Sequence, residues 1–247
     1  MLSRFVTIMV VVLTISLIAG ASQAADVTSK LLAYWPLDSD VKDIIGGHDG
    51  NLVGGASFVQ DAKRGKVLKV DGVDGHAVVP HSNDIAFGIT DSFTLSAWVY
   101  VSVLPGHWAG IVDKSRDISP WYGIWIDTSN KWVGGTNNIT GSVAKPNVWI
   151  HAAYVQDTAS SKRLVYIDGN VDIQGTPVDS SGAGELWMGG AKSVTEFLNG
   201  LIDDVALYGR ALTPDDIAAL AGGAKIAGGN AVDPLAKLTT TWGTMKQ

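Results

Sequence analysis

The chain has 247 residues, of which 46% are hydrophobic and 17% are charged, and it contains no cysteine. This length and apolar content exclude a disordered chain and are enough to form the core of one large all-β domain. The missing cysteine excludes a disulfide scaffold, a thiol nucleophile and a zinc site with cysteine ligands. The excess of 24 acidic over 18 basic residues argues against a nucleic-acid partner, because phosphate contacts need a basic surface.

The first 24 residues have the pattern of a secretory signal peptide. Met1–Arg4 is short and positive, Phe5–Ile18 is apolar, and small residues precede a cut after Ala24. The apolar stretch is short for a membrane span, which favours cleavage over a retained anchor. We therefore expect a secreted protein, periplasmic or extracellular, with no membrane partner after cleavage.

Alternating apolar and polar residues predict strands from about residue 31 to 208. Residues 93–99 alternate in this way, which is typical of a half-buried strand. Further strands are predicted at 109–113, 121–127, 148–156 and 163–167. Asp168-Gly169 lies between two alternating runs, which indicates a hairpin with a type I′ turn. Many short strands with frequent glycine turns indicate an all-β sandwich or jelly roll.

One short helix is predicted near the C-terminus. Thr213 is a good N-cap, Pro214 suits the first helical position, and Gly222-Gly223 ends the run. Residues 221–247 then form a Gly/Ala-rich linker and a short tail. The apolar residues of the tail suit either a docking segment or a short helix.

Seven phrases follow one another along the chain. They are LAYWPLD (32–38), LKVDG (68–72), FTLSAWV (93–99), WIHAAYV (149–155), VYIDG (165–169), NGLIDDVALY (199–208) and RALT (210–213). Together they resemble the laminin G-like, concanavalin A-like lectin/glucanase domain, over about residues 31–220. The resemblance implies a two-sheet antiparallel jelly-roll sandwich with one curved face, and it places the domain at 25–220. It also implies that many relatives bind carbohydrate or protein, and that many hold one structural calcium ion.

A calcium site is expected at the loop formed by residues 71–75. Calcium needs several hard oxygen ligands on a chain that can bend, and this loop offers two aspartates between glycines. In the resembled family a carboxylate before the final strand, here Asp203 or Asp204, approaches this loop. The candidate metal ligands are Asp71, Asp203, Asp74 and Asp38. The alternative is that the loop aspartates cap turns and that Asp204 pairs with Arg210.

Eight of the nine tryptophans divide into two groups, and the ninth, Trp242, lies in the C-terminal tail. Those inside strand patterns, including Trp98 and Trp149, are expected to fill the core or to cover a sheet. Four others cluster between residues 105 and 135, where an exposed ring could stack on the C–H face of a sugar. The candidate ligand-binding residues are Trp108, Trp121, Tyr122, Trp132 and Asn137. The alternative is that Trp125 and Trp132 simply pack between the sheets.

The carboxylates argue against a glycoside hydrolase. Hydrolysis needs two carboxyl groups that face each other across the scissile bond. The resembled glucanases use closely spaced glutamates on one strand, whereas Glu185 and Glu196 lie eleven residues apart in different segments. We expect a non-catalytic, lectin-like binding domain that recognises a glycan or polysaccharide together with calcium. The alternative is a protein-interaction or adhesion domain on the same fold, with an extracellular protein as its partner.

Overall fold

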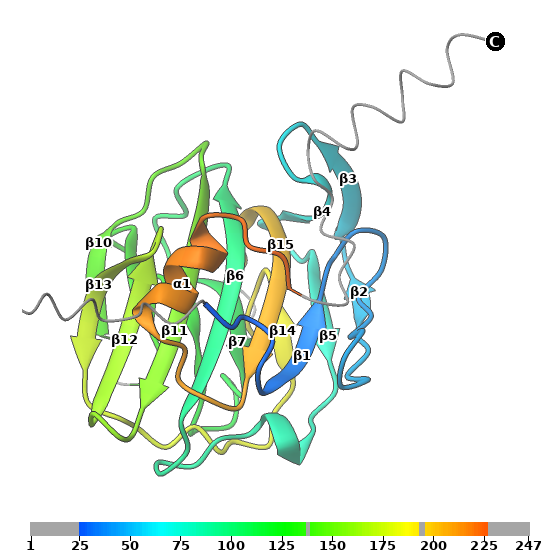
Figure 1. Ribbon diagram of the computed structural model, residues 1–247. Helices are drawn as coiled ribbons and strands as arrows, with labels where there is room; N and C mark the ends of the chain where they lie inside the picture. Colours follow the sequence, from blue (N-terminus) through cyan, green and yellow to red (C-terminus); the bar gives the residue numbers. More distant parts are fainter. Residues whose placement is uncertain (1–24, 137–138, 193–195, 227–247) are drawn as a thin grey trace, which may run out of the picture.

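Two antiparallel sheets pack face to face (Figure 1). The computed structural model describes residues 25–136, 139–192 and 196–226. The eight-stranded sheet contains β13 (Asn170–Gly175), β12 (Lys162–Ile167), β11 (Trp149–Asp157), β6 (Phe93–Val101), β15 (Asn199–Tyr208), β4 (Gly65–Asp71) and β3 (Ser57–Asp61) in this order, with β1 (Leu31–Trp35) also paired to β15. The seven-stranded sheet contains β10 (Ile139–Val143), β9 (Lys131–Gly134), β8 (Tyr122–Ile126), β7 (Ala109–Lys114), β14 (Leu186–Met188), β5 (His76–Val79) and β2 (Asn51–Val53).

The core lies between the two sheets, and the strand alternation directs side chains into it. In β6, the residues Leu95, Ala97 and Val99 are fully buried in the main cluster. Ile111 of β7 and Ile124 of β8 meet them from the opposite sheet. This is the all-β jelly-roll sandwich that the alternation and the family resemblance predicted, and the strand predictions are confirmed to within a few residues.

The β12–β13 hairpin turns at the predicted dipeptide. Ile167 pairs with Asn170, so the loop contains only Asp168 and Gly169. Their φ angles are 47° and 80°, and two successive positive φ angles are characteristic of a type I′ turn. Glycine accepts this conformation without strain, and aspartate tolerates it better than most residues do. The prediction of a tight hairpin is confirmed.

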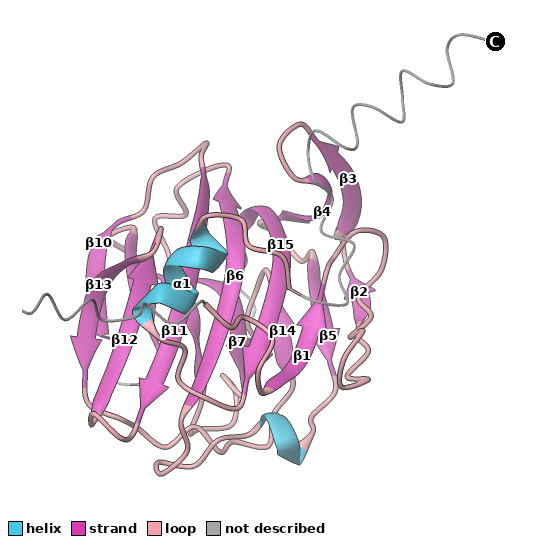
Figure 2. Cartoon of the chain, viewed as in Figure 1, coloured by secondary structure: helices cyan, strands magenta, loops and turns pink. Residues whose placement is uncertain are grey.

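The C-terminal helix is also confirmed, as α1 (Pro214–Ala221). Thr213 Oγ1 accepts a hydrogen bond from the Asp216 amide at 3.1 Å, and the Asp216 carboxylate accepts one from the Thr213 amide at 3.0 Å. This capping box satisfies two amides at the helix start. The helix lies on the outer face of the eight-stranded sheet, where Ile217 and Leu220 pack in a second apolar cluster with Tyr208 (Figure 2). The other helical segment of the described chain is the 3-10 turn η1 (Asn83–Ile85).

No helix within the described ranges is long and apolar enough to cross a membrane. The predicted signal peptide at 1–24 and the tail from residue 227 onward lie outside the described residues.

Candidate functional site

Three indoles meet on the outer face of the seven-stranded sheet. Trp125 projects outward from β8 because its neighbours Ile124 and Ile126 point into the core. Trp121 and Trp108 immediately precede β8 and β7, and their ring centroids lie 5.5 and 6.4 Å from that of Trp125. The structure therefore brings together two of the predicted ligand-binding residues, Trp108 and Trp121.

Arg116 completes this group, which we call the aromatic face: Trp108, Trp121, Trp125 and Arg116. The guanidinium carbon lies 5.3 Å from the ring centre of Trp121 and 5.2 Å from that of Trp125. Trp125 is 0% exposed and Trp121 is 8% exposed, whereas Trp108 is half-buried and the Arg116 side chain is 37% exposed. Two buried indoles thus support an accessible layer formed by Trp108 and Arg116.

Buried polar atoms without partners surround the aromatic face. Within the described residues, Asp113 Oδ2, Trp125 Nε1 and Glu196 Oε2 are buried and have no hydrogen-bond partner. Each such atom costs about 1–3 kcal/mol if its hydrogen bond stays unmade. The three atoms lie on one side of the sheet: Asp113 is on β7 in register with Gly123 of β8, and Arg116 pairs with the other oxygen of Glu196 at 3.3 Å. Because each of these atoms is shielded from solvent, a water molecule enclosed in the fold could supply the missing partner, whereas a ligand on the surface could not reach it.

Asp113 lies near the middle of this outer face and is buried. Burial raises the pKa of its carboxyl well above the usual range, and the positive charge of Arg116 offsets only part of that rise. The negative charges of Glu196 and Asp117 raise the pKa further. A protonated carboxyl is a hydrogen-bond donor, so Asp113 and the Trp125 Nε1–H are two unused donors beside one unused acceptor on Glu196.

The charges along this face are largely paired. Lys192 Nζ lies 3.2 Å from Asp117 and 3.5 Å from Glu185, and Glu185 also accepts a hydrogen bond from Trp187 Nε1 at 3.0 Å. Trp187 stacks on His76 with ring centroids 3.8 Å apart, which continues the aromatic surface along the sheet. The two cations beside the indoles, Arg116 and Lys192, are each paired to carboxylates, so they leave no excess positive charge there for an anionic ligand.

Two of the predicted ligand-binding residues are placed in the core, and the structure corrects them. Tyr122 is fully buried and its hydroxyl donates to the Ile85 carbonyl at 2.9 Å. Trp132 is 1% exposed and packs in the main cluster between the sheets. Neither side chain can contact a surface ligand, because β8 and β9 direct them inward. Asn137 lies outside the described residues.

The calcium candidates Asp71 and Asp74 cap backbone turns. Asp71 Oδ1 accepts hydrogen bonds from the amides of Val73 and Gly75, both at 2.9 Å. Asp74 Oδ1 accepts one from the Gly55 amide at 2.8 Å. Both aspartates therefore cap turns, which was the alternative to calcium binding. Each uses one carboxylate oxygen in its turn, and the second oxygen stays available.

Asp203 lies elsewhere and does not fit as a ligand shared with Asp71. Asn199 is the residue of β15 opposite Asp71, and Asp203 is four residues further along, about 13 Å at 3.3 Å per residue. Asp203 Oδ2 accepts from Arg64 Nε at 2.7 Å on the outer face of the eight-stranded sheet. Within the described ranges, no three His, Asp or Glu side chains gather as a metal-binding group. Asp38, the fourth candidate, contributes negative charge near Asp203.

The alternative pairing of Asp204 with Arg210 is wrong. Arg210 Nη1 bonds Asp216 at 2.8 Å beside the helix start, whereas Asp204 pairs with Arg64. The reason is topological: Arg64 lies in the turn between β3 and β4, and this hairpin places it against β15.

Comparison with known proteins agrees with this architecture. The family model described as the concanavalin A-like lectin/glucanases superfamily matches residues 71–218. The chain belongs to this superfamily. No curated protein matches the chain.

Solved structures of similar fold include a domain in complex with arabinotriose and a binding domain. Domain 4 of AbnA, a GH43 extracellular arabinanase from Geobacillus stearothermophilus in complex with arabinotriose, is 22% identical with a TM-score of 0.64, over 78% of this chain and 98% of that domain. The binding domain of Paraclostridial Mosquitocidal Protein 1 is 15% identical with a TM-score of 0.64, over 79% of this chain and 52% of that one. Trypanosoma rangeli sialidase is 20% identical with a TM-score of 0.62, over 85% of this chain and 35% of the sialidase. At these identities the likeness concerns the fold, and the chain spans about a third of the sialidase.

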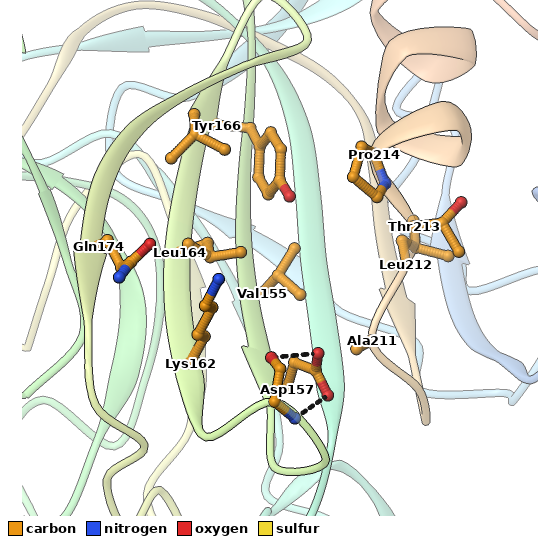
Figure 3. Close-up of a pocket in the computed structure, with 12 residues that line it drawn as sticks. Val155, Asp157, Lys162, Leu164, Tyr166, Gln174, Ala211, Leu212, Thr213 and Pro214 are labelled. Carbon is orange, nitrogen blue, oxygen red and sulfur yellow. Dashed lines mark hydrogen bonds between the residues drawn. The ribbon is translucent and has the colours of Figure 1, made fainter.

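A groove of 440 Å³ lies on the other side of this concanavalin A-like sandwich, between β11–β13 and the start of α1 (Figure 3). Its floor is apolar and includes Val155, Leu164 and Tyr166. The polar atoms of Asp157 on its rim are used internally, because they accept hydrogen bonds from the amide and hydroxyl of Ser160. Asp157 is therefore already engaged, and the polar side chains of Lys162 and Gln174 also line the groove.

Sequence reasoning missed Asp113, Arg116 and Glu196. The available signal was the charged pair Asp113-Lys114 at the end of an apolar run. Lys114 turned inward to bond the carbonyls of Gly182 and Gly184 at 3.0 and 2.8 Å, so only one member of the pair belongs to the site. The spacing in the sequence could not show whether Asp113 or Lys114 faces the site.

Proposed function

We propose that this chain is a secreted, non-catalytic domain that binds a neutral glycan on the aromatic face. The observation that carries the proposal is the accessible pair Trp108 and Arg116, held over two packed indoles and beside unpaired polar atoms. Two structures of similar fold support it, one a domain solved with arabinotriose and the other named a binding domain. The signal-peptide pattern at 1–24 supports secretion.

The chemistry of the face suits a sugar. An indole presents an apolar surface to the C–H face of a sugar ring, and Trp108 is the accessible indole of the group. Arg116 Nη2 donates one hydrogen bond to Glu196, and the guanidinium has further N–H donors for hydroxyl groups. The Asp113 carboxyl and the Trp125 Nε1–H lie beneath this layer and are shielded from solvent, so the polar contacts to a sugar come from Arg116.

Binding is favoured over hydrolysis because of where the carboxylates lie. Asp113 is fully buried, and Glu196 is held by Arg116. Hydrolysis needs two carboxyl groups that both reach the scissile bond. A protein ligand is the second candidate, since exposed aromatic and arginine side chains are also common at protein interfaces.

The test is affinity electrophoresis of the full chain through gels that contain arabinan, xylan, galactan, mannan or β-glucan. Trp108→Ala and Arg116→Ala are each compared with Val103→Ala, a control at an exposed position of the same connection that lies outside the indole cluster. We expect at least one polysaccharide to retard the wild type and the control, and to retard both site variants about tenfold less.

Retardation that is unchanged in Trp108→Ala and Arg116→Ala would refute this site. Turnover of a polysaccharide, seen as new reducing ends, would refute the non-catalytic part of the proposal. If no polysaccharide retards the wild type, the glycan proposal fails and the protein-binding candidate takes its place.

A further inference from the structure

A second aromatic surface lies on the opposite side of the sandwich, on the outer face of the eight-stranded sheet. In β6 and β11, Tyr100 pairs with Trp149, and Trp98 pairs with His151 in the neighbouring row. Since Val99 and Ile150 point into the core, Trp98, Tyr100 and Trp149 point outward. The rings of Tyr100 and Trp149 lie 5.7 Å apart.

These three rings are not explained by apolar packing. All three are half-buried, and none belongs to an apolar cluster of the described chain. Helix α1 covers a different part of the same face, where it packs on residues such as Ala153 and Tyr208. Large aromatic side chains left at the surface and grouped together are typical of a binding surface.

Arg64 shapes the polar part of this surface. Its guanidinium carbon lies 4.2 Å from the ring centre of Trp98 and 5.4 Å from that of Trp149. Nε and Nη2 bond Asp203 and Asp204, and the side chain is 16% exposed. Nη1 makes no hydrogen bond within the described residues, so the guanidinium keeps a donor for a ligand beside the partly exposed carboxylate of Asp204.

The charge balance selects the kind of ligand. An anionic ligand would meet Asp204 and Asp203 as well as the Asp61 carboxylate, which accepts from Trp149 Nε1 at 3.2 Å. A cationic ligand would have to displace Arg64, which already occupies the carboxylates and the face of Trp98. A neutral ligand with hydroxyl groups avoids both penalties and can use both an arginine donor and a carboxylate acceptor.

From this arrangement we infer that Trp98, Tyr100, Trp149 and Arg64 form a second surface for a neutral glycan. It is separate from the aromatic face and rests on its own observations. Because the two outer faces of a sandwich point in opposite directions, one chain that uses both surfaces bridges two glycan strands. Bridging raises the apparent affinity for a polymer without any new contact.

The experiment uses the full chain labelled with 5-fluorotryptophan, whose fluorine resonances are assigned from single Trp→Phe variants. The same panel of arabinan, xylan, galactan, mannan and β-glucan oligosaccharides is titrated in. We expect at least one oligosaccharide to shift the resonances of Trp98 and Trp149. Trp149→Ala and Tyr100→Ala should weaken this titration about tenfold, which corresponds to about 1.4 kcal/mol, while Trp108→Ala leaves it unchanged.

The outcomes separate the two surfaces. Shifts confined to Trp108, Trp121 and Trp125 would overturn the second surface and leave the proposed function standing. Shifts confined to Trp98 and Trp149 would support the second surface and refute glycan binding on the aromatic face. If no oligosaccharide shifts either group, both inferences fail. Tyr100→Ala guards against misfolding, because Tyr100 carries none of the Arg64 contacts that tie the β3–β4 hairpin to the sheet.

Discussion

Replacing Asp113 by asparagine tests whether the aromatic face holds a neutral carboxyl group. Asp113 is 1% exposed, and its Oδ2 atom lacks a hydrogen-bond partner among the described residues. Burial raises the pKa of the carboxyl well above the ordinary range. The folded protein therefore keeps a proton on Asp113 at pH values where the unfolded chain has already lost it.

The size and sign of the effect follow from this difference in proton uptake. A folded-state pKa that is raised contributes stability that is present below about pH 4 and is lost as the pH rises towards the folded-state pKa. In this interval the wild type loses about 1.4 kcal/mol of unfolding free energy per pH unit through this one group. Asp113→Asn removes the titration, so its stability relative to wild type should rise by that amount per pH unit and then level off.

The assay is urea unfolding at pH 5, 6, 7 and 8, followed by tryptophan fluorescence. Because every other titrating group is common to both proteins, their difference isolates Asp113. Asp179→Asn is the control, since Asp179 is exposed, caps the Ser181 amide at 3.2 Å and is not among the charges that shift the pKa of Asp113. A stability difference between Asp113→Asn and wild type that stays constant over this pH range would refute a protonated Asp113.

Three further outcomes are expected. Burial, with a smaller effect of the Arg64 charge, lowers the pKa of His151 to about 3, so wild-type stability should fall as the pH drops from about 6.5 towards 3. His151→Gln should lose this slope of up to about 1.4 kcal/mol per pH unit in urea unfolding, and an unchanged slope would contradict the assignment. Thr213→Ala breaks the capping box and should cost about 1 kcal/mol, whereas no change in urea midpoint would mean that the helix start does not depend on it. If calcium binds at the 71–75 loop, adding it after EDTA treatment should raise the melting temperature, and Asp71→Asn and Asp74→Asn should abolish the rise. Asp127→Asn alters a similar turn cap elsewhere and should leave this rise in melting temperature unchanged. If calcium does not raise the melting temperature of the wild type, the calcium site is refuted.

Local signals predicted most of the fold because they act over a few residues. The alternation in 93–99 and the dipeptide Asp168-Gly169 each depend on near neighbours, and both appear in the structure as expected. The capping interaction of Thr213 spans three positions and could be predicted from the sequence in the same way. Such elements need no knowledge of which strands pair.

The site was harder to predict because it depends on which face of each strand points inward. Residues 121–126 are apolar on both faces, so alternation could not separate the inward Tyr122 from the outward Trp125. The pairing of Arg64 with Asp203 spans 139 residues and requires the β4–β15 register, to which no local pattern points. Asp204 has a φ of 48° at a register shift in β15, and this irregularity places two consecutive aspartates beside one arginine.

The two outer faces differ in how their buried polar atoms are paired within the fold. On the eight-stranded sheet, Asp203 and Asp204 share Arg64, so the buried charge there is compensated within the fold. On the seven-stranded sheet, three buried polar atoms beside the indoles lack partners among the described residues, and on the eight-stranded sheet His151 Nδ1, beside Trp98, lacks one too. At about 1–3 kcal/mol each, such atoms lower the stability of the protein unless an enclosed water completes their hydrogen bonds, because none of them is open to a ligand on the surface. The polar contacts of a bound glycan therefore come from the accessible groups of each face: Arg116 on the aromatic face, and Arg64 with Asp204 on the Trp98–Trp149 surface.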